Sequence, residues 1–337
     1  MRAIAIGVAG LMVSLSLPSP AASWGFKGHE IVGEIADQII ARDHPQLQQR
    51  IREILRGRDL SKVARYPDCA LFDCDMEPKG YFNAFNKRNP QSALYHFTDV
   101  PIQRSRYAAG SAGTHPHDVV QMLRYSVGFL RGAAPADVPA NLKEHEAIWM
   151  IAHLVGDIHQ PLHVGALYFD RTCSRIVSPD VDFADDEEFK IGTTVAETHG
   201  GGWIKIKPSR QLHKVWDNEA VDGAMKLAGV TNGSAADFAR TVLANPPANW
   251  QTGGDAATWG RRWANEILPM AKEAHNPSRI EIKTPGVDQD ETHKVECNWD
   301  ATLAQGYDEW AAQRVREQLG KAGFRLVAML RAVLEDD

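Results

Sequence analysis

The sequence predicts a mainly α-helical fold in one domain over residues 24–337, and three observations support it. Apolar residues recur at steps of three and four over much of the chain beyond residue 23. Stretches in which apolar and polar residues alternate are few. The sequence contains no internal repeat and no low-complexity linker, and its length can bury a substantial hydrophobic core.

The first 23 residues are typical of a cleavable secretory signal. Arg2 is followed by an uncharged apolar run over residues 3–17, and residues 18–20 break that run with two prolines. Small residues at positions 21–23 suit removal after Ser23. The run is short for a membrane span, so a retained anchor is the weaker alternative. We expect a chain beginning at Trp24, secreted or periplasmic, with no later segment apolar enough to cross a membrane.

The helical periodicity marks the individual elements. Helices are expected over residues 31–40, 47–55, 119–130, 145–159, 235–243, 259–271 and 311–334. Period-two patterns predict short strands at 203–207 and 280–283. The acidic segment 170–199 shows little periodicity and is interpreted as a long surface excursion between two helices. Its acidic residues fit a solvated loop better than a calcium site, because their spacing does not match an EF-hand.

Four cysteines indicate two disulfides in an exported protein. Three pairings are possible. The short separation of Cys69 and Cys74 makes a local loop plausible, which would leave Cys173 to pair with Cys297. None of them has zinc-finger spacing, so they are not interpreted as metal ligands.

The net charge of −6 bears on the class of substrate. Proteins that grip duplex DNA electrostatically are usually basic. If this chain acts on nucleic acid, something other than lysine and arginine must supply the positive charge, and bound metal would do so.

The densest cluster of chemistry-bearing residues spans His153 to His163. His153 and Asp157 are four residues apart, so on a helix they share one face and can chelate one ion. Pro161 ends or kinks that helix, which allows His163 to turn toward a second ion.

The same spacing recurs at His213 and Asp217. A single His–Asp pair at helical spacing is often only a surface hydrogen bond. Two such pairs in an exported protein favour a metal site, and imidazole with carboxylate is the donor set of catalytic zinc.

Further donors stand upstream. Trp24 would carry a free α-amino group after signal removal, which can bind metal together with its carbonyl, and His29 follows closely. Asp68 and His96 by themselves would be interpreted as a helix cap and a core histidine.

Together these residues resemble the ligand set of the S1/P1 nucleases, which are zinc-dependent single-strand nucleases and 3′-nucleotidases whose fold is shared with bacterial phospholipase C. The resemblance runs over nearly the whole chain after the signal and includes residues 156–163 and 318–326. It implies a helical phospholipase C/nuclease-type fold with a trinuclear zinc cleft. The implied ligands are Asp68, His96, His153 and Asp157 for one ion, Trp24, His29 and the shared Asp157 for another, and His163, His213 and Asp217 for the third.

The resemblance also assigns other roles. Asp68 and Asp157 are the expected catalytic carboxylates, Asp99 resembles the position that hydrogen-bonds the nucleobase, and Phe97 would offer it an apolar contact. His159 lies on a different helix face from Asp157 and is expected to be a packing residue. The chain departs from the family where Gly200 to Trp203 stand in place of the usual Gly-Gly-Asn, which bears on substrate preference.

Charge suggests the mechanism. Three Zn²⁺ ions against three ligand carboxylates leave a site of about +3, which would attract phosphate to an acidic chain. Zinc lowers the pKa of bound water to about 7, so hydroxide would be available to attack phosphorus in line. The expected activity is hydrolysis of single-stranded DNA and RNA to 5′-nucleotides and removal of 3′-phosphates from nucleotides, with no membrane or protein partner implied.

Two other functions fit the sequence less well. A phospholipase C-like hydrolase of lipid head groups would need an apolar membrane-facing rim, and the sequence shows no amphipathic anchor and no basic face. A non-catalytic exported zinc protein would have closed four-ligand sites, often with cysteine, whereas these His/Asp sets suit open coordination.

Overall fold

The computed structural model describes residues 24–72, 74, 76, 79–138, 140–184, 189–283 and 297–335. The expected signal segment, residues 1–23, lies outside the described residues, as do residues 185–188 of the acidic segment.

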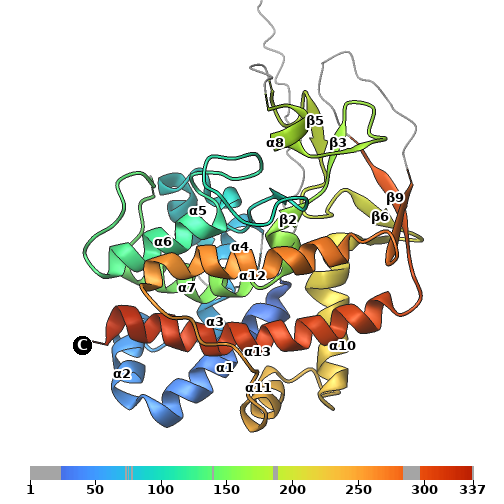
Figure 1. Ribbon diagram of the computed structural model, residues 1–337. Coiled ribbons are helices and arrows are strands. Elements are labelled where there is room, and N and C mark those ends of the chain that lie inside the picture. Colours follow the sequence, from blue (N-terminus) through green and yellow to red (C-terminus); the bar gives the residue numbers. More distant parts are fainter. Residues whose placement is uncertain are drawn as a thin grey trace, which may run out of the picture.

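Helices dominate the structure, so the predicted mainly α class is confirmed (Figure 1). Every segment predicted to be helical contains a helix. The longer helices are α1 (Phe26–Asp43), α2 (Pro45–Ile54), α5 (Lys79–Arg88), α6 (Val119–Leu130), α7 (Glu144–Asp157), α10 (Ala220–Leu227), α11 (Ala235–Ala244), α12 (Trp259–Ala274) and α13 (Tyr307–Leu334). The shorter ones are α3 (Leu60–Val63), α4 (Tyr66–Leu71), α8 (Pro179–Asp182), α9 (Leu212–Lys214), the 3₁₀ turns η1 (Ser92–Leu94), η2 (Pro161–His163) and η4 (Ala256–Thr258), and the π-helical turn η3 (Val215–Glu219).

Helix α7 is the centre of the bundle. Its residues from Glu146 to Asp157 are all buried, because α1, α3, α4, α6 and α13 pack around it. A helix that is apolar on every side must lie inside the protein, and this one ends at the densest cluster of predicted ligands. Asp118 caps the neighbouring α6 by accepting from the backbone N–H groups of Val120 and Gln121.

Helices α1 and α13 cross at close range. A Cβ atom at Gly323 of α13 would lie 2.4 Å from Ile35 Cγ2 of α1, and one at Gly33 would lie 2.5 Å from the backbone of Ser61. Along α13, the residues Ala311, Val315 and Leu319 continue a buried stripe at four-residue spacing. Glycine therefore lets α1, which carries His29, pack tightly against two other elements.

The strands form three small sheets. Strand β1 (Val100–Pro101) pairs in parallel with β2 (Gly165–Ala166). The second sheet has the order β4-β3-β5, and the third has the order β7-β6-β9-β8. In the third, β6 (Ile204–Ile206) and β8 (Ile280–Lys283) are the predicted strands, while β7 (Arg210–Gln211) and β9 (Trp299–Leu303) complete it.

The acidic segment has more regular structure than a surface excursion. It contains the end of β3 (Tyr168–Asp170), all of β4 (Ile176–Val177) and β5 (Val195–Glu197), and α8. The side chains of Tyr168, Val177 and Val195 form a separate small core beneath this sheet. Strands of two or three residues are too short to show alternation, so sequence periodicity missed them.

Both disulfides have the favoured pairing. Cys69 pairs with Cys74, and Cys173 pairs with Cys297, with Cα–Cα separations of 5.5 and 5.9 Å. The second bond ties the acidic segment to the start of β9, where the Trp299 indole also donates to the Cys173 carbonyl. Two disulfides are typical of proteins in an oxidising compartment. Within the described residues, no helix combines the length and apolar character that a membrane span requires.

Candidate metal centre

The C-terminal turn of α7 brings two of the predicted ligands onto one face. His153 and Asp157 are both fully buried, and His153 Nε2 lies 3.1 Å from Asp157 Oδ2. This is the i,i+4 geometry that the sequence spacing predicts.

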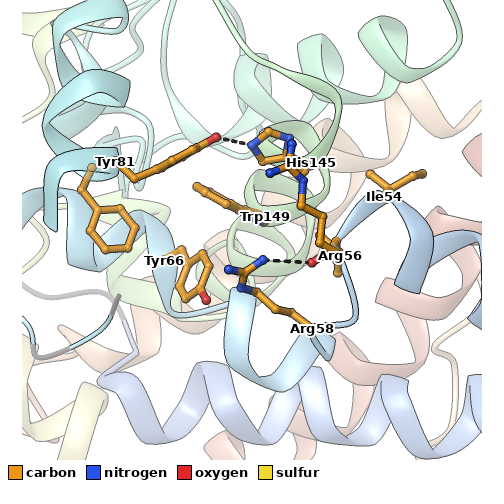
Figure 2. A pocket seen from close by; sticks show the side chains of 9 residues that line it. Ile54, Arg56, Arg58, Tyr66, Tyr81, His145 and Trp149 are labelled. Atoms are coloured by element: carbon orange, nitrogen blue, oxygen red, sulfur yellow. Dashed lines mark hydrogen bonds between the residues drawn. The ribbon is translucent and has the colours of Figure 1, made fainter. Parts of the chain in front are cut away.

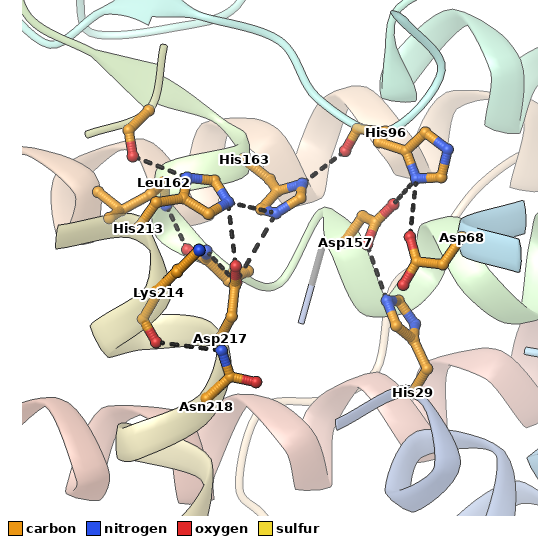
Figure 3. Close-up of polar contacts among 12 residues, drawn as sticks. His29, Asp68, His96, Asp157, Leu162, His163, His213, Lys214, Asp217 and Asn218 are labelled. Atoms are coloured by element: carbon orange, nitrogen blue, oxygen red, sulfur yellow. Dashed lines mark hydrogen bonds and ion pairs between the residues drawn. The ribbon is translucent and has the colours of Figure 1, made fainter. Parts of the chain in front are cut away.

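The two oxygens of Asp157 face different groups of donors (Figure 3). Oδ1 lies 3.2 Å from His29 Nε2, which α1 contributes. Oδ2 lies 3.3 Å from His96 Nδ1, which follows η1, and faces His153 as well. A carboxylate in this position can serve two ions at once.

Asp68, His96 and His153 form the first donor group. His96 Nδ1 lies 2.8 Å from His153 Nε2 and 3.7 Å from Asp68 Oδ1, and His153 Nε2 lies 3.5 Å from the same oxygen. Asp68 is in the first turn of α4, so four separate elements of the chain converge on this point once α1 is included.

His163, His213 and Asp217 form a second group beside it. His213 Nε2 lies 3.1 Å from His163 Nε2 and 3.3 Å from Asp217 Oδ2. His163 Nε2 is 4.0 Å from Asp217 Oδ1. The π-helical turn Val215–Glu219 supplies Asp217, and such turns occur frequently at functional sites.

Backbone carbonyls fix the tautomers of three of these imidazoles. His153 Nδ1 lies 2.6 Å from the Ala64 oxygen, His163 Nδ1 lies 2.7 Å from the His96 oxygen, and His213 Nδ1 lies 2.9 Å from the Gly200 oxygen. A carbonyl only accepts, so in each ring Nδ1 carries the hydrogen and Nε2 turns its lone pair toward the cluster.

This arrangement fits bound cations. The Nε2 lone pairs of His163 and His213 face each other at 3.1 Å, which is repulsive unless a positive charge lies between them. Asp68 Oδ1 and Asp217 Oδ2 are buried and accept no hydrogen bond from the described residues. Imidazole lone pairs and buried carboxylate oxygens that converge in this way form a donor set that could hold metal ions.

The pKa shifts favour metal over protons as the source of that charge. Burial lowers the pKa of His153, and it lowers the pKa of His163 well below its usual range. Burial also raises the pKa of Asp68 and of Asp157 to about 7. Burial therefore disfavours both the imidazolium and the carboxylate forms, and a bound divalent cation would stabilise neutral imidazoles beside ionised carboxylates.

Gln160 is a positioning residue that sequence reasoning missed. Its side-chain amide donates to Asp217 Oδ1 at 2.9 Å, and its own oxygen accepts from the backbone N–H of Leu162. Gln160 lies between Asp157 and Pro161 in the sequence, and this closeness to the predicted ligands is the sequence feature that could have indicated its role.

Trp24 lies at the edge of the centre. Its side chain is buried against Gly28, and the backbone N–H of Gly25 donates to the Asp217 carbonyl at 3.0 Å. The structure thus brings together the eight residues predicted to bind metal through their side chains, and the backbone that follows Trp24 packs against one of them. Metal binding by all nine stays a prediction.

Asp99 has a partner that the sequence did not reveal. It is buried beside Glu197 of β5, and His199 Nδ1 lies 3.7 Å from Glu197 Oε1. Burial raises the pKa of both carboxyl groups, and their proximity raises that of Glu197 further. Phe97, two residues before Asp99, is partly exposed. Glu197 was missed because it lies in the acidic segment that was interpreted as a loop.

His159 is a packing residue, as expected. Its Nδ1 donates to the Val155 carbonyl at 2.7 Å, and its Nε2 accepts from Arg325 Nη1 at 2.8 Å. Arg325, in the C-terminal segment that matches the family, also pairs with Glu266 and donates to the Trp250 carbonyl. This network, of which His159 and Arg325 are buried, anchors α13 behind the metal centre.

Comparison with known proteins agrees with this geometry. The family model described as "S1/P1 Nuclease" matches residues 24–335. Endonuclease 4 of Arabidopsis thaliana is 24% identical over 337 residues, covering 96% of this chain and 94% of the relative. Endonuclease 2 of the same plant is 25% identical over 326 residues, covering 92% and 90%. The chain therefore belongs to the S1/P1 nuclease family, and it is a metal-dependent nuclease that hydrolyses phosphodiester bonds.

Proposed function

We propose that the chain is a zinc-dependent endonuclease and 3′-nucleotidase that holds three Zn²⁺ ions. It hydrolyses single-stranded DNA and RNA to 5′-nucleotides and removes 3′-phosphates from nucleotides. The observation that carries this proposal is the Asp157 carboxylate, whose two oxygens face separate imidazole groups within one buried cluster. We further propose that residues 24–337 form the nuclease domain, exported after removal of residues 1–23.

The residues that would hold zinc follow from the first and second donor groups and from the pairing of His29 with Asp157. Asp68, His96 and His153 would hold one ion with Asp157, the Trp24 main chain and His29 would hold a second that shares Asp157, and His163, His213 and Asp217 would hold the third. Zinc bound there supplies Lewis acidity, an activated water at neutral pH and positive charge for the phosphate.

The chain itself positions the reaction. Carbonyls of Ala64, His96 and Gly200 hold three imidazoles in the tautomer that presents Nε2 to the cluster. Gln160 orients Asp217. Because the donors are buried and fixed, little reorganisation is needed when a phosphate binds.

Asp99 and Phe97 are the proposed contacts to the nucleobase. Asp99 lies three residues after His96, a predicted ligand. Its neighbour Glu197 lies three residues before Gly200, whose carbonyl accepts a hydrogen bond from His213. The base contact is thus tied by short segments to both donor groups. A buried site of this kind requires an unpaired nucleotide, which favours single strands over duplexes.

The test is one assay on the mature protein with and without a zinc chelator. Substrates are single-stranded DNA, single-stranded RNA, duplex DNA, a 3′-mononucleotide and phosphatidylcholine. We expect chelator-sensitive release of 5′-nucleotides from single strands and of phosphate from the 3′-mononucleotide. Cleavage of phosphatidylcholine alone would replace the proposal with the phospholipase C-like alternative, and no cleavage by protein that contains three zincs would contradict both.

A further inference from the structure

A cavity outside the metal centre lies where the turn after α2 meets α4, α5 and the start of α7 (Figure 2). Its volume is about 140 Å³. Four aromatic side chains form its walls: Tyr66, Tyr81, Phe82 and Trp149.

The aromatic walls are held in place before any ligand arrives. The Trp149 ring meets Tyr66 edge-on at 4.8 Å between centroids and meets Tyr81 at 5.2 Å with a tilt of 57°. Tyr66 also meets Phe82 edge-on at 5.5 Å. Tyr66, Phe82 and Trp149 are buried, so their rings cannot rearrange freely. A rigid aromatic box costs little conformational entropy when a planar ligand enters it.

Cationic side chains surround the opening of this box. Arg56 and Arg58 come from the turn after α2, and Figure 2 shows them beside Tyr66 and Trp149, with His145 on the same rim. Lys143 Nζ lies 5.5 Å from the centre of the Tyr81 ring. Glu146 accepts a hydrogen bond from the Tyr81 hydroxyl, and it is buried and paired with Arg88. The rim is therefore positive in a chain whose net charge is −6.

The cavity shares its scaffold with the metal centre. Tyr66 lies two residues before Asp68 on α4, and Trp149 lies one helical turn before His153 on α7. Four residues of helix advance about 6 Å along the axis. The aromatic walls are therefore built on the same two helices as the predicted ligands Asp68 and His153, about one helical turn away from them.

We propose that this cavity is a nucleotide subsite for the single-stranded substrate, which holds a base one or more positions away from the cleaved bond. The base stacks against the aromatic walls, and Arg56 and Arg58 bind the adjoining phosphate. Aromatic rings accept any base face, and arginine pairs with phosphate through two parallel hydrogen bonds. The inference rests on the proposed function and adds a contact that a mononucleotide cannot make while its phosphate is at the metal centre.

The first experiment removes the positive rim. The double variant Arg56→Ala/Arg58→Ala is compared with Arg50→Ala/Arg52→Ala, which removes the same charge from exposed positions on α2 outside the cavity. For a single-stranded 12-mer we expect KM to rise roughly tenfold more in the rim variant than in the control. The penalty on the 3′-mononucleotide should be smaller, and the dependence of log K on log salt should weaken by roughly 0.7 per arginine removed. Equal effects in the two double variants would overturn the proposal.

A second pair of variants tests stacking. Tyr81→Phe keeps the ring and Tyr81→Ala removes it, while both lose the hydroxyl that contacts Glu146. We expect the phenylalanine variant to keep most of the affinity for the 12-mer and the alanine variant to lose it. Equal losses would assign Tyr81 a structural role only and would contradict stacking.

Binding is also measured by fluorescence anisotropy with the 12-mer and the zinc-free mature chain, so that the result does not depend on cleavage. If the rim variant binds more weakly than its control but no form cleaves nucleic acid, the subsite stands and the proposed function fails. If wild type cleaves single strands and the rim variant matches its control in both assays, the subsite alone is wrong.

Discussion

At the scale of single residues, the metal centre depends on where each proton lies. Three imidazoles donate from Nδ1 to carbonyls contributed by Ala64, His96 and Gly200, so their Nε2 atoms are committed to the cluster. Outer hydrogen bonds of this kind orient the ligand and raise its basicity. The centre is thus organised by main-chain groups as much as by the ligands.

Asp157 should be the most sensitive ligand, because its two oxygens face two donor groups. We predict that Asp157→Asn lowers kcat/KM for single-stranded DNA by roughly a thousandfold or more, about 4 kcal/mol in transition-state stabilisation. The zinc content should fall below three per chain. Steady-state kinetics and elemental analysis of the purified variant measure both effects.

Asp37→Asn is the matched control for that substitution. Asp37 is a partly buried carboxylate outside the metal centre, and it caps α3 by accepting from the backbone N–H groups of Leu60 and Ser61. The Asp37→Asn variant should lose some stability and keep its zinc and its activity. Near-normal turnover in Asp157→Asn would show that the two metal positions do not share this ligand.

Trp24 yields a prediction about the N-terminus. The backbone after Trp24 is fixed to the Asp217 carbonyl, and the Trp24 side chain is buried. Residues added ahead of Trp24 would convert its α-amino group into an amide and remove a ligand. We predict that such a form loses most of its activity, whereas the same extension after Asp337 does not. Full activity with the N-terminal extension, checked by mass spectrometry for the intact terminus, would exclude the α-amino ligand.

At the scale of elements, the orientation of one predicted ligand depends on a close contact between two helices. Gly33 of α1 lies against the backbone of α3, and α3 leads directly to Ala64, whose carbonyl holds His153. The packing of α1 on α3 therefore sets the orientation of a ligand that belongs to neither helix. The π-helical turn at Val215–Glu219 has a comparable role for Asp217.

The close contact at Gly33 can be tested by adding one methyl group. A Cβ atom there would lie 2.5 Å from the Ser61 backbone, so Gly33→Ala must push α3 away from α1. We predict a loss of about 1–3 kcal/mol in the free energy of unfolding. Gly80→Ala is the control, because a Cβ atom at that position of α5 meets no described atom within 4 Å. Thermal melting should show a lower Tm for the first variant and an equal or higher Tm for the second, and equal behaviour of the pair would be inconsistent with tight helix contact.

At the scale of the whole molecule, the acidic chain and the buried centre make stability depend on metal. Burial raises the pKa of Asp68 and Asp157 to about 7, far above the values they would have in the unfolded chain. Between about pH 4 and 7 these two carboxyl groups therefore bind more protons in the metal-free folded state than in the unfolded state. Their contribution to the free energy of unfolding falls as the pH rises through this window and levels off above it, whereas the buried histidines of the cluster, whose pKa values are lowered, contribute in the opposite direction below about pH 6.5.

Zinc should offset this loss, because its ligands are ionised when it is bound. We predict that the difference in Tm between the zinc-loaded and zinc-free protein widens as the pH rises from about 5 to 7, then stays nearly constant to about pH 8. Calorimetry on both forms across this range measures it. A difference that narrows with rising pH would mean that these carboxylates are not metal ligands.

The sequence by itself determined the helical class and the spacing of the candidate ligands, and it favoured, without deciding, the disulfide pairing that the structure shows. The helical class and the spacing follow from local geometry, because residues such as His153 and Asp157 share a helix face whatever surrounds them. The short strands β3, β4 and β5 were not predictable, since two or three residues cannot show an alternating pattern and β5 pairs with β3 from the far end of the acidic segment.

Only the tertiary structure decided how the predicted ligands are oriented and what holds them. The two-sided position of Asp157, the carbonyls that fix the imidazoles, the Asp99–Glu197 pair and the aromatic cavity each join residues that are far apart in sequence. Such contacts depend on how helices pack, and packing is decided by the whole core rather than by any local pattern.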